Sequence, residues 1–180
     1  MSERTEFELQ TDRLTLRAIE PRDSDAIAAI LGDPEVMYAW EHGFGAEEIR
    51  DWVENNRLRA EREGYGYRAV IETSSGNLIG VCGLLEEMAD GERYLGVGYI
   101  FDKRYWGRGY ATESARAIVD YAFKTLGAAA VTAQIRPENT PSRKVAEKLG
   151  MKVEKVFVKH YRGKEMPHLL YKTKESAFHR

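Results

Sequence analysis

Apolar and polar side chains alternate along residues 14–19, which is the pattern of a strand with one buried face. Three further apolar segments follow later in the chain, and turn-forming residues at 74–77 and 90–91 separate them. These segments predict an antiparallel meander of three strands, at residues 65–71, 78–85 and 94–101.

Two helices are predicted between the first strand and this meander. Asp23 is expected to cap a short helix that passes through Ile27 and Ile30 and ends near Gly32. Residues 46–63 then carry a stripe of apolar side chains on one helical face, which indicates that the second helix packs on the core. The stripe consists of Ile49, Trp52, Val53 and Ala60.

Helices and strands alternate after the meander. A helix is predicted at residues 110–125, a strand at 128–135, and a further helix from Pro141 to Gly150. The last apolar segments predict a hairpin, with strands at 153–161 and 169–172. Because a strand–helix–strand passage needs a parallel crossover, the pattern predicts an α+β fold with a mixed sheet.

Composition narrows the choice of partners. The chain has 27 Lys and Arg against 29 Asp and Glu, a net charge of −2, so there is no basic surplus to hold a nucleic acid. No apolar run reaches the ~20 residues that a membrane helix needs, and the first residues lack the apolar core of a signal peptide. We therefore expect neither a nucleic acid nor a membrane as partner.

Cysteine and histidine usage adds two expectations. The single cysteine, Cys82, cannot form an internal disulfide, which fits a reducing compartment and a cytoplasmic protein. The four histidines show no metal-ligand spacing, so no metal is predicted. With 180 residues, we expect one domain at 9–174, with flexible ends at 1–8 and 175–180.

The sharpest feature is the pair Gly107 and Gly109, which lies between a predicted strand and a predicted helix. Glycines allow close approach of the backbone, and the first helical amides have no intrahelical acceptor, so this turn suits a phosphate or pyrophosphate. Arg104 and Arg108 flank it. The alternative is that the glycines only shape a tight loop. A dinucleotide fingerprint would need glycine at Thr112, and a Walker A motif is absent.

The run Arg104-Tyr-Trp-Gly107-Arg-Gly109 resembles the GNAT superfamily of acyl-CoA-dependent N-acetyltransferases, in particular the branch of ribosomal-protein N-terminal acetyltransferases. Four more segments resemble that branch, at residues 11–17, 32–37, 76–80 and 139–151. The resemblance implies a mixed, mostly antiparallel sheet of six to seven strands flanked by about four helices. Its fourth and fifth strands would splay apart.

The resemblance also implies how acetyl-CoA would be held. The turn residues would bind its pyrophosphate, the preceding strand would pair with the pantetheine arm, and a later helix would supply Asn139 to the pantetheine and Ser142 near the sulfur. Asn139 and Ser142 could instead serve only to cap that helix. The strand and turn residues so assigned are Tyr99, Ile100, Phe101, Arg104, Gly107, Arg108, Gly109, Tyr110, Ala111 and Thr112.

Two positions depart from the family's catalytic pattern. Ala146 stands where relatives often have a tyrosine that protonates the thiolate, which leaves Ser142 as the general-acid candidate. Gly96 stands where many relatives carry a glutamate base. Glu41, His160 or a chain of water could replace that base, or proximity of amine and thioester could contribute most of the acceleration.

We therefore predict transfer of an acetyl group from acetyl-CoA to a primary amine, by direct attack in a ternary complex and without a metal. The resemblance places Trp40 and Glu41 on the wall of the acceptor pocket, where they would suit a cationic amine, although Trp40 could also be part of the core. The acceptor would be a protein N-terminus or a small molecule such as a polyamine, an amino acid or an aminoglycoside. The alternative function is a non-catalytic sensor that binds acyl-CoA. The protein is expected to be a monomer or a homodimer.

Overall fold

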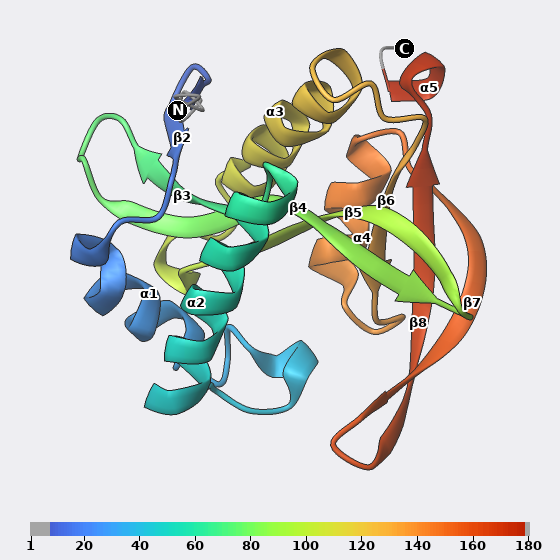
Figure 1. Ribbon diagram of the computed structural model, residues 1–180, viewed down its shortest axis with the longest axis horizontal. Coiled ribbons are helices and arrows are strands. Elements are labelled where there is room, and N and C mark those ends of the chain that lie inside the picture. The colour runs from blue at the N-terminus through green and yellow to red at the C-terminus, as the bar shows by residue number, and fades with distance from the viewer. Residues whose placement is uncertain (1–7, 179–180) are drawn as a thin grey trace. The chain divides into compact units, whose positions relative to one another are not determined.

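The computed structural model describes residues 8–178, and its path is traced in Figure 1. The chain forms two compact units, which are described separately. The first unit contains residues up to Gly83 together with Tyr99–Ala117, and the second contains Leu84–Gly98 and the residues from Ile118 onward. Of the ends expected to be flexible, residues 1–7 and 179–180 lie outside the described part.

The first unit is built on antiparallel strands. They are β1 (Leu9–Gln10), β2 (Leu14–Arg17), β3 (Tyr67–Glu72), the start of β4 (Leu78–Ala89) and the end of β5 (Glu92–Phe101). Val70 of β3 lies opposite Leu16 on one side and Gly80 on the other. This unit also contains α1 (Ser24–Leu31), α2 (Ala46–Glu63) and the beginning of α3 (Tyr110–Lys124).

Helix α2 packs on the core as its apolar stripe predicts. Ile49, Trp52 and Val53 contact a buried cluster that includes Ile27 of α1 and Ile100 of β5. Ala60, the last member of the predicted stripe, is exposed. The remaining buried members of the cluster are Ile30, Leu31, Met37 and Val81.

A buried amide ties α2 to β3. The side chain of Asn56 accepts a hydrogen bond from the backbone N–H of Tyr67 (2.7 Å) and donates one to the Tyr67 carbonyl (3.0 Å). These two hydrogen bonds give the backbone N–H and carbonyl of a strand residue the partners that a neighbouring strand would otherwise supply.

The second unit carries the C-terminal strands. Besides parts of β4 and β5 it contains β6 (Val131–Ile135), α4 (Thr140–Lys148), β7 (Lys152–Tyr161), β8 (Lys164–Thr173) and α5 (Glu175–Phe178). β6 pairs in parallel with β5, registered at Gly96 opposite Thr132, whereas β8 is antiparallel to both β6 and β7. The strand order is β1-β2-β3-β4-β5-β6-β8-β7.

The predicted class, a mixed and mostly antiparallel α+β fold, is confirmed, and two details differ. Among residues 8–178 there are eight strands instead of six or seven, because the two-residue strand β1 is too short to show a period. The described residues also form five α-helices instead of about four. The fifth, α5, brings Phe178 against Phe123, with ring centroids 5.6 Å apart.

Asp23 is the N-cap residue of α1, as expected, but its side chain bonds elsewhere. Its buried carboxylate makes no capping hydrogen bond to α1. It accepts hydrogen bonds from both terminal nitrogens of Arg17 (2.8 and 2.9 Å) and from the backbone N–H of Glu20 (2.7 Å). The ion pair with Arg17 outweighs capping, because a buried carboxylate needs a charged partner.

Candidate active site

The predicted anion turn is open to solvent. Gly107 and Gly109 have φ values of +74° and +81°, in the region that favours glycine, and both are exposed. Apart from the two neighbouring residues, no heavy atom of residues 8–178 lies within 4 Å of the place that a Cβ on Gly107 would take. α3 starts directly after the turn, and the N–H of Glu113 donates to the carbonyl of Gly109 at 3.0 Å. The amides that precede Glu113 have no acceptor within the helix, which is the arrangement of backbone donors that suits an anion.

Arg13 holds the turn in place from the strand side. Its Nη1 donates to the carbonyl of Arg108 at 2.9 Å, and its Nε donates to Oε2 of Glu113 at 2.7 Å. The guanidinium carbon also lies 4.3 Å from the ring centroid of Tyr110. The hydroxyl of Tyr110 in turn donates to Glu72 of β3. The turn and the first helical residues are therefore fixed by contacts that leave their outward face uncovered.

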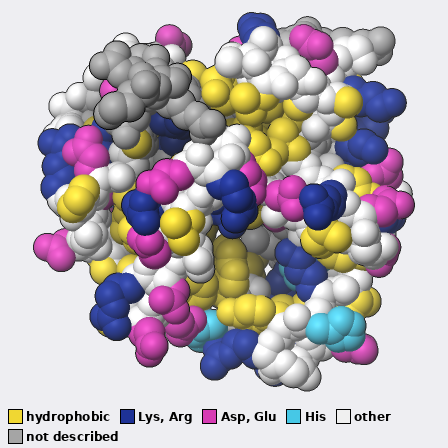
Figure 2. Space-filling view, viewed as in Figure 1, with side chains coloured by type: hydrophobic (Ala, Val, Ile, Leu, Met, Phe, Trp, Pro, Cys, Tyr) yellow, Lys and Arg dark blue, Asp and Glu magenta, His cyan; other side chains and the backbone are white. Residues whose placement is uncertain are grey.

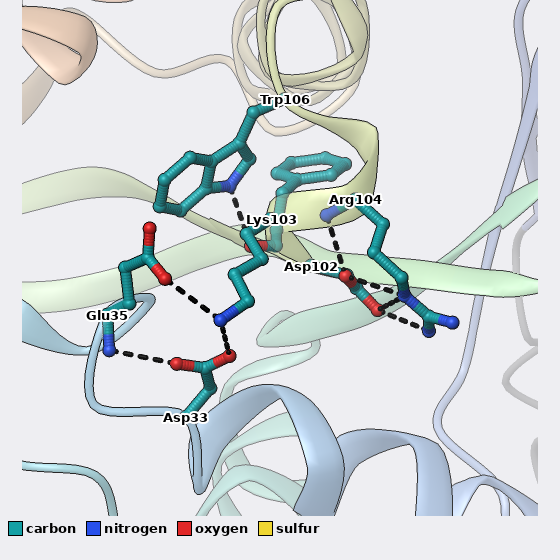
Figure 3. Close-up of polar contacts among 7 residues, drawn as sticks. Asp33, Glu35, Asp102, Lys103, Arg104 and Trp106 are labelled. Atoms are coloured by element: carbon teal, nitrogen blue, oxygen red, sulfur yellow. Dashed lines mark hydrogen bonds and ion pairs between the residues drawn. The ribbon is translucent and has the colours of Figure 1, made fainter.

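Arg104, predicted to pair with the bound anion, is paired with Asp102 in the structure (Figure 3). Its Nη2 lies 2.6 Å from Oδ2 of Asp102, and its backbone N–H also donates to that carboxylate at 2.9 Å. Hydrogen bonds from Arg104 hold the pKa of Asp102 below its usual range. The carboxylate of Asp102 thus neutralises part of the charge of Arg104. The guanidinium carbon of Arg108, in contrast, lies over an aromatic ring, 5.4 Å from the ring centroid of Tyr105.

Lys103 joins the same segment to the loop after α1 (Figure 3). Its Nζ lies 2.8 Å from Oε2 of Glu35 and 3.0 Å from Oδ2 of Asp33. Hydrogen bonds that Lys103 donates to the carboxylates of Glu35 and Asp33 raise the pKa of Lys103 to about 12. Lys103 therefore stays positively charged at neutral pH and anchors the approach to the turn.

The end of β5 offers its backbone and buries its side chains. Ile100 and Phe101 are 5% and 6% exposed, and the indole Nε1 of Trp106 donates to the Phe101 carbonyl at 2.9 Å. A Cβ on Gly80 of β4 would lie only 2.6 Å from the Phe101 ring. Tyr99 is half-buried, and the main-chain contact of Tyr99, Ile100 and Phe101 with pantetheine stays a prediction.

The loop predicted to wall the acceptor pocket packs beside that strand. Trp40 is half-buried against the core cluster that contains Ile100. Glu41 is exposed and has a left-handed backbone, with φ +65°. His42 fixes the loop to α2, since Nδ1 lies 2.9 Å from the Trp40 carbonyl and Nε2 lies 2.8 Å from Oε2 of Glu48. Trp40 is therefore at least partly a core residue, the alternative considered for it.

In the second unit, Asn139 caps α4. Its Oδ1 accepts a hydrogen bond from the backbone N–H of Ser142 at 3.3 Å. Ser142 is half-buried, and Ala146, one helical turn further on, is fully buried. His160 is exposed on β7, opposite Glu165 of β8. Capping, one of the two roles considered for Asn139, is present, and it leaves the side-chain NH₂ group for another contact.

Glu87 and Gln134 are two residues that the sequence analysis does not single out. The carboxylate of Glu87, on β4, fills the space above Gly96 of β5. Gln134, on β6, donates from Nε2 to the carbonyl of Met88 at 3.0 Å. Neither contact has a signal in the sequence, because each depends on which strands become neighbours.

Four further properties of the described residues concern surface charge, the cysteine thiol, possible metal ligands and membrane-spanning helices. Acidic and basic side chains are intermingled on the face shown in Figure 2. Cys82 is buried, and burial raises the pKa of its thiol to about 12. Within residues 8–178, no cluster of three or more His, Cys, Asp or Glu side chains could hold a metal ion. No helix in the described part is long and apolar enough to cross a membrane.

Comparison with known proteins identifies the family. Residues 13–152 match the model of the acetyltransferase (GNAT) domain. The N-acetyltransferase p20 of Bacillus licheniformis, whose function is uncharacterized, is 33% identical over 150 residues, which are 81% of this chain and 83% of p20.

Solved structures share the fold. The crystal structure of a GNAT-family acetyltransferase from Bacillus anthracis superposes with a TM-score of 0.79 and 29% identity, over 94% of this chain and 99% of that one. RimL, a ribosomal L7/L12 alpha-N-protein acetyltransferase in complex with coenzyme A, gives a TM-score of 0.78 at 18% identity, over 95% and 99%. The chain therefore belongs to the GNAT family of acetyltransferases and is an acyltransferase.

Proposed function

We propose that this protein transfers an acetyl group from acetyl-CoA to a primary amine, by direct attack of the amine in a ternary complex. The observation that carries the proposal is the turn at Gly107 and Gly109, which presents unpaired helical amides to solvent in a chain of this family. Anionic diphosphate is the group of coenzyme A that such amides would hold.

Further coenzyme A contacts are proposed for residues of the first unit. The amides of residues 107–112 would bind the pyrophosphate, and Arg108 would add a positive charge, whereas Arg104 would contribute less because Asp102 already pairs with it. The main chain of Tyr99, Ile100 and Phe101 would pair with pantetheine, since two of these side chains are buried in the core.

Asn139 and Ser142 are proposed for the reactive end of the cofactor. The Oδ1 atom of Asn139 caps α4, so its NH₂ group would donate to a pantetheine carbonyl. The Ser142 hydroxyl would give a proton to the departing thiolate, the role that a tyrosine at the position of Ala146 has in many relatives. Ala146 is fully buried and has no proton to give.

The acceptor must lose a proton before it attacks, because an alkylammonium has no lone pair. Glu41 and His160 are the base candidates that the resemblance suggests, and both are exposed. Trp40, which packs against the core cluster that contains Ile100, would form an aromatic wall for a cationic amine. RimL, which shares the fold, acts on a protein N-terminus, so an N-terminal amine is one acceptor to test.

An acceptor panel tests this function. The protein would be mixed with acetyl-CoA and one of three amines: a tripeptide with a free N-terminal alanine, spermidine, or kanamycin. Release of free thiol would be followed with time, and the products would be weighed by mass spectrometry. We expect one acetyl group to replace one hydrogen on at least one amine. Release of thiol at the same slow rate with and without every amine, together with no heat of acetyl-CoA binding, would overturn the proposal.

A further inference from the structure

Gly96 of β5 gives space to a carboxylate of the neighbouring strand. An ideal Cβ on Gly96 would lie 2.8 Å from the carboxyl carbon of Glu87, which no real pair of atoms would tolerate. Gly96 is buried, and so is Oε2 of Glu87. A side chain at position 96 would therefore displace Glu87, and the glycine is what allows the carboxylate to lie over β5.

The amide of Gln134 reaches the same part of β4. Its Nε2 bonds to the carbonyl of Met88, the residue after Glu87, although β5 lies between β6 and β4 in the strand order. Its Oε1 is buried and has no hydrogen-bond partner among residues 8–178. Because Gly96 lies opposite Thr132, Gln134 is on the face of the sheet to which a side chain at 96 would point.

This face of the second unit thus offers a carboxylate and a buried amide oxygen near one stretch of β4. Both are acceptors, so the group that they suit is a donor with several protons and a positive charge, such as an ammonium. β5 continues from Gly96 into the residues proposed to pair with pantetheine.

We propose that Glu87 is the general base of the acetyl transfer, an inference that rests on the function proposed above. The Glu87 carboxylate accepts one proton from the acceptor's ammonium group and leaves a neutral amine. The amine nitrogen forms a C–N bond to the thioester carbonyl carbon as the C–S bond breaks. The sulfur takes a proton from the Ser142 hydroxyl and leaves as the thiol of coenzyme A. The hydroxyl regains a proton from the nitrogen, and Glu87 returns its proton to solvent.

Glu87 restores a group that this chain lacks at its usual place. The resemblance implies that many relatives carry a glutamate where Gly96 stands on β5, and here a carboxylate reaches that space from β4 instead. Glu41 and His160 are exposed, whereas Oε2 of Glu87 is buried, which removes competing water from the proton transfer. Gln134 Oε1 would hold a second N–H of the same ammonium and so orient it.

The first test compares Glu87→Gln with Glu86→Gln. Glu86 is the preceding residue of β4, is exposed and lies 3.8 Å from Arg93, so it is a matched control. The assay uses the amine of the three-member panel on which the unmodified protein is fastest. We expect Glu87→Gln to lower kcat by about 100-fold or more, with acetyl-CoA affinity unchanged in calorimetry. The loss should shrink as pH rises toward the pKa of the amine, because free amine then needs no base. Glu86→Gln should keep the original kcat.

The second test moves the carboxylate. Glu87→Ala empties the space over β5, and Gly96→Glu in the same chain supplies a carboxylate from the other strand. We expect the double variant to regain part of the kcat that Glu87→Ala loses, and Gly96→Ala alone to lower kcat by displacing Glu87.

The outcomes separate this assignment from the proposed function. If the unmodified protein acetylates no amine of the panel and gives no heat of acetyl-CoA binding, the proposed function fails and the assignment fails with it. If it acetylates an amine and Glu87→Gln is equally fast, only the assignment is overturned. A kcat loss that is the same at every pH and comes with a lower melting temperature would give Glu87 a structural role and would also overturn it.

Discussion

Arg13 and Glu113 form an ion pair that closes the base of the anion turn. Nη2 and Nε of Arg13 lie 2.6 and 2.7 Å from the same carboxylate oxygen of Glu113, and the backbone N–H of Arg13 donates to the other oxygen at 3.0 Å. The hydroxyl of Thr11 adds a fourth contact at 2.6 Å. Since Arg13 also binds the Arg108 carbonyl, this pair connects the segment before β2 to both sides of the turn.

Replacing Glu113 by Gln is therefore expected to loosen the turn. The side-chain amide of glutamine has the shape of the carboxylate but no charge. Its NH₂ group would face Arg13 or Thr11, and both of these donate hydrogen bonds to Glu113. The expected cost is about 1–2 kcal/mol of unfolding free energy, with a several-fold weaker affinity for acetyl-CoA. Urea denaturation and calorimetry measure the two effects. A variant with unchanged affinity would show that the turn does not depend on this pair.

Acid should destabilise the protein through Asp23. Burial by itself would raise the pKa of Asp23, but hydrogen bonds from Arg17 and the Glu20 backbone outweigh it and hold the pKa below the ordinary 3.8. A lowered pKa in the folded state means that the stabilisation is complete above pH ~4 and is lost as pH falls through the folded pKa. Urea unfolding between pH 7 and 2 should show this loss. The Asp23→Asn variant should have a lower unfolding free energy at pH 7 than the unmodified protein. That free energy should also fall by a smaller amount between pH 7 and 2.

Gly109→Ala tests the turn directly. Among residues 8–178, and apart from its chain neighbours, the atom that a Cβ there would meet is Arg13 Nη2, at an ordinary 3.5 Å, so the penalty comes from the φ of +81°. That strain is about 1–2 kcal/mol, and relief by movement of the turn should weaken acetyl-CoA binding about tenfold. Gly163→Ala is the matched control, because φ is +76° and nothing lies near its Cβ. Equal acetyl-CoA affinity in the two variants would contradict the proposed site, whereas Gly109→Pro should abolish binding.

Cys82 should be chemically silent in the folded protein. The thiol is fully buried in β4, and burial raises its pKa to about 12, so almost no thiolate exists at pH 8. An aromatic disulfide reagent should give no colour with the native protein and one equivalent after denaturation in urea. Cys82→Ala should leave the rate of acetyl transfer unchanged. Rapid labelling of the native protein would mean that β4 opens.

Short sequence patterns predict most of the helices, strands and turns. The turn at 90–91 was expected from its sequence, and both residues have positive φ, as the two-residue hairpin turns require. The spacing of Gly107 and Gly109 predicted a turn before a helix, and both adopt the left-handed backbone that only glycine reaches without strain. In each case the residues that carry the signal are the residues that make the structure.

Contacts between distant segments could not be predicted in this way. Glu87 lies over Gly96 because of the register of two strands, and Asn56 binds Tyr67 because a helix packs on a strand. β8 begins at Lys164, five residues before the strand predicted at 169, and Pro167 lies within it. Proline usually argues against a strand, but Pro167 pairs only with β7, since the pairing of β8 with β6 is registered from Leu169 to Thr173.

The tight packing at Gly80 limits how this enzyme could be redesigned. A Cβ at that position would lie 2.7 Å from the carbonyl oxygen of Ile100 as well as against the Phe101 ring. Any larger residue would push the main chain that is proposed to carry the thioester. A mutant library aimed at new acyl groups should therefore leave position 80 unvaried, and natural variants that tolerate a side chain there should show a compensating change at position 101.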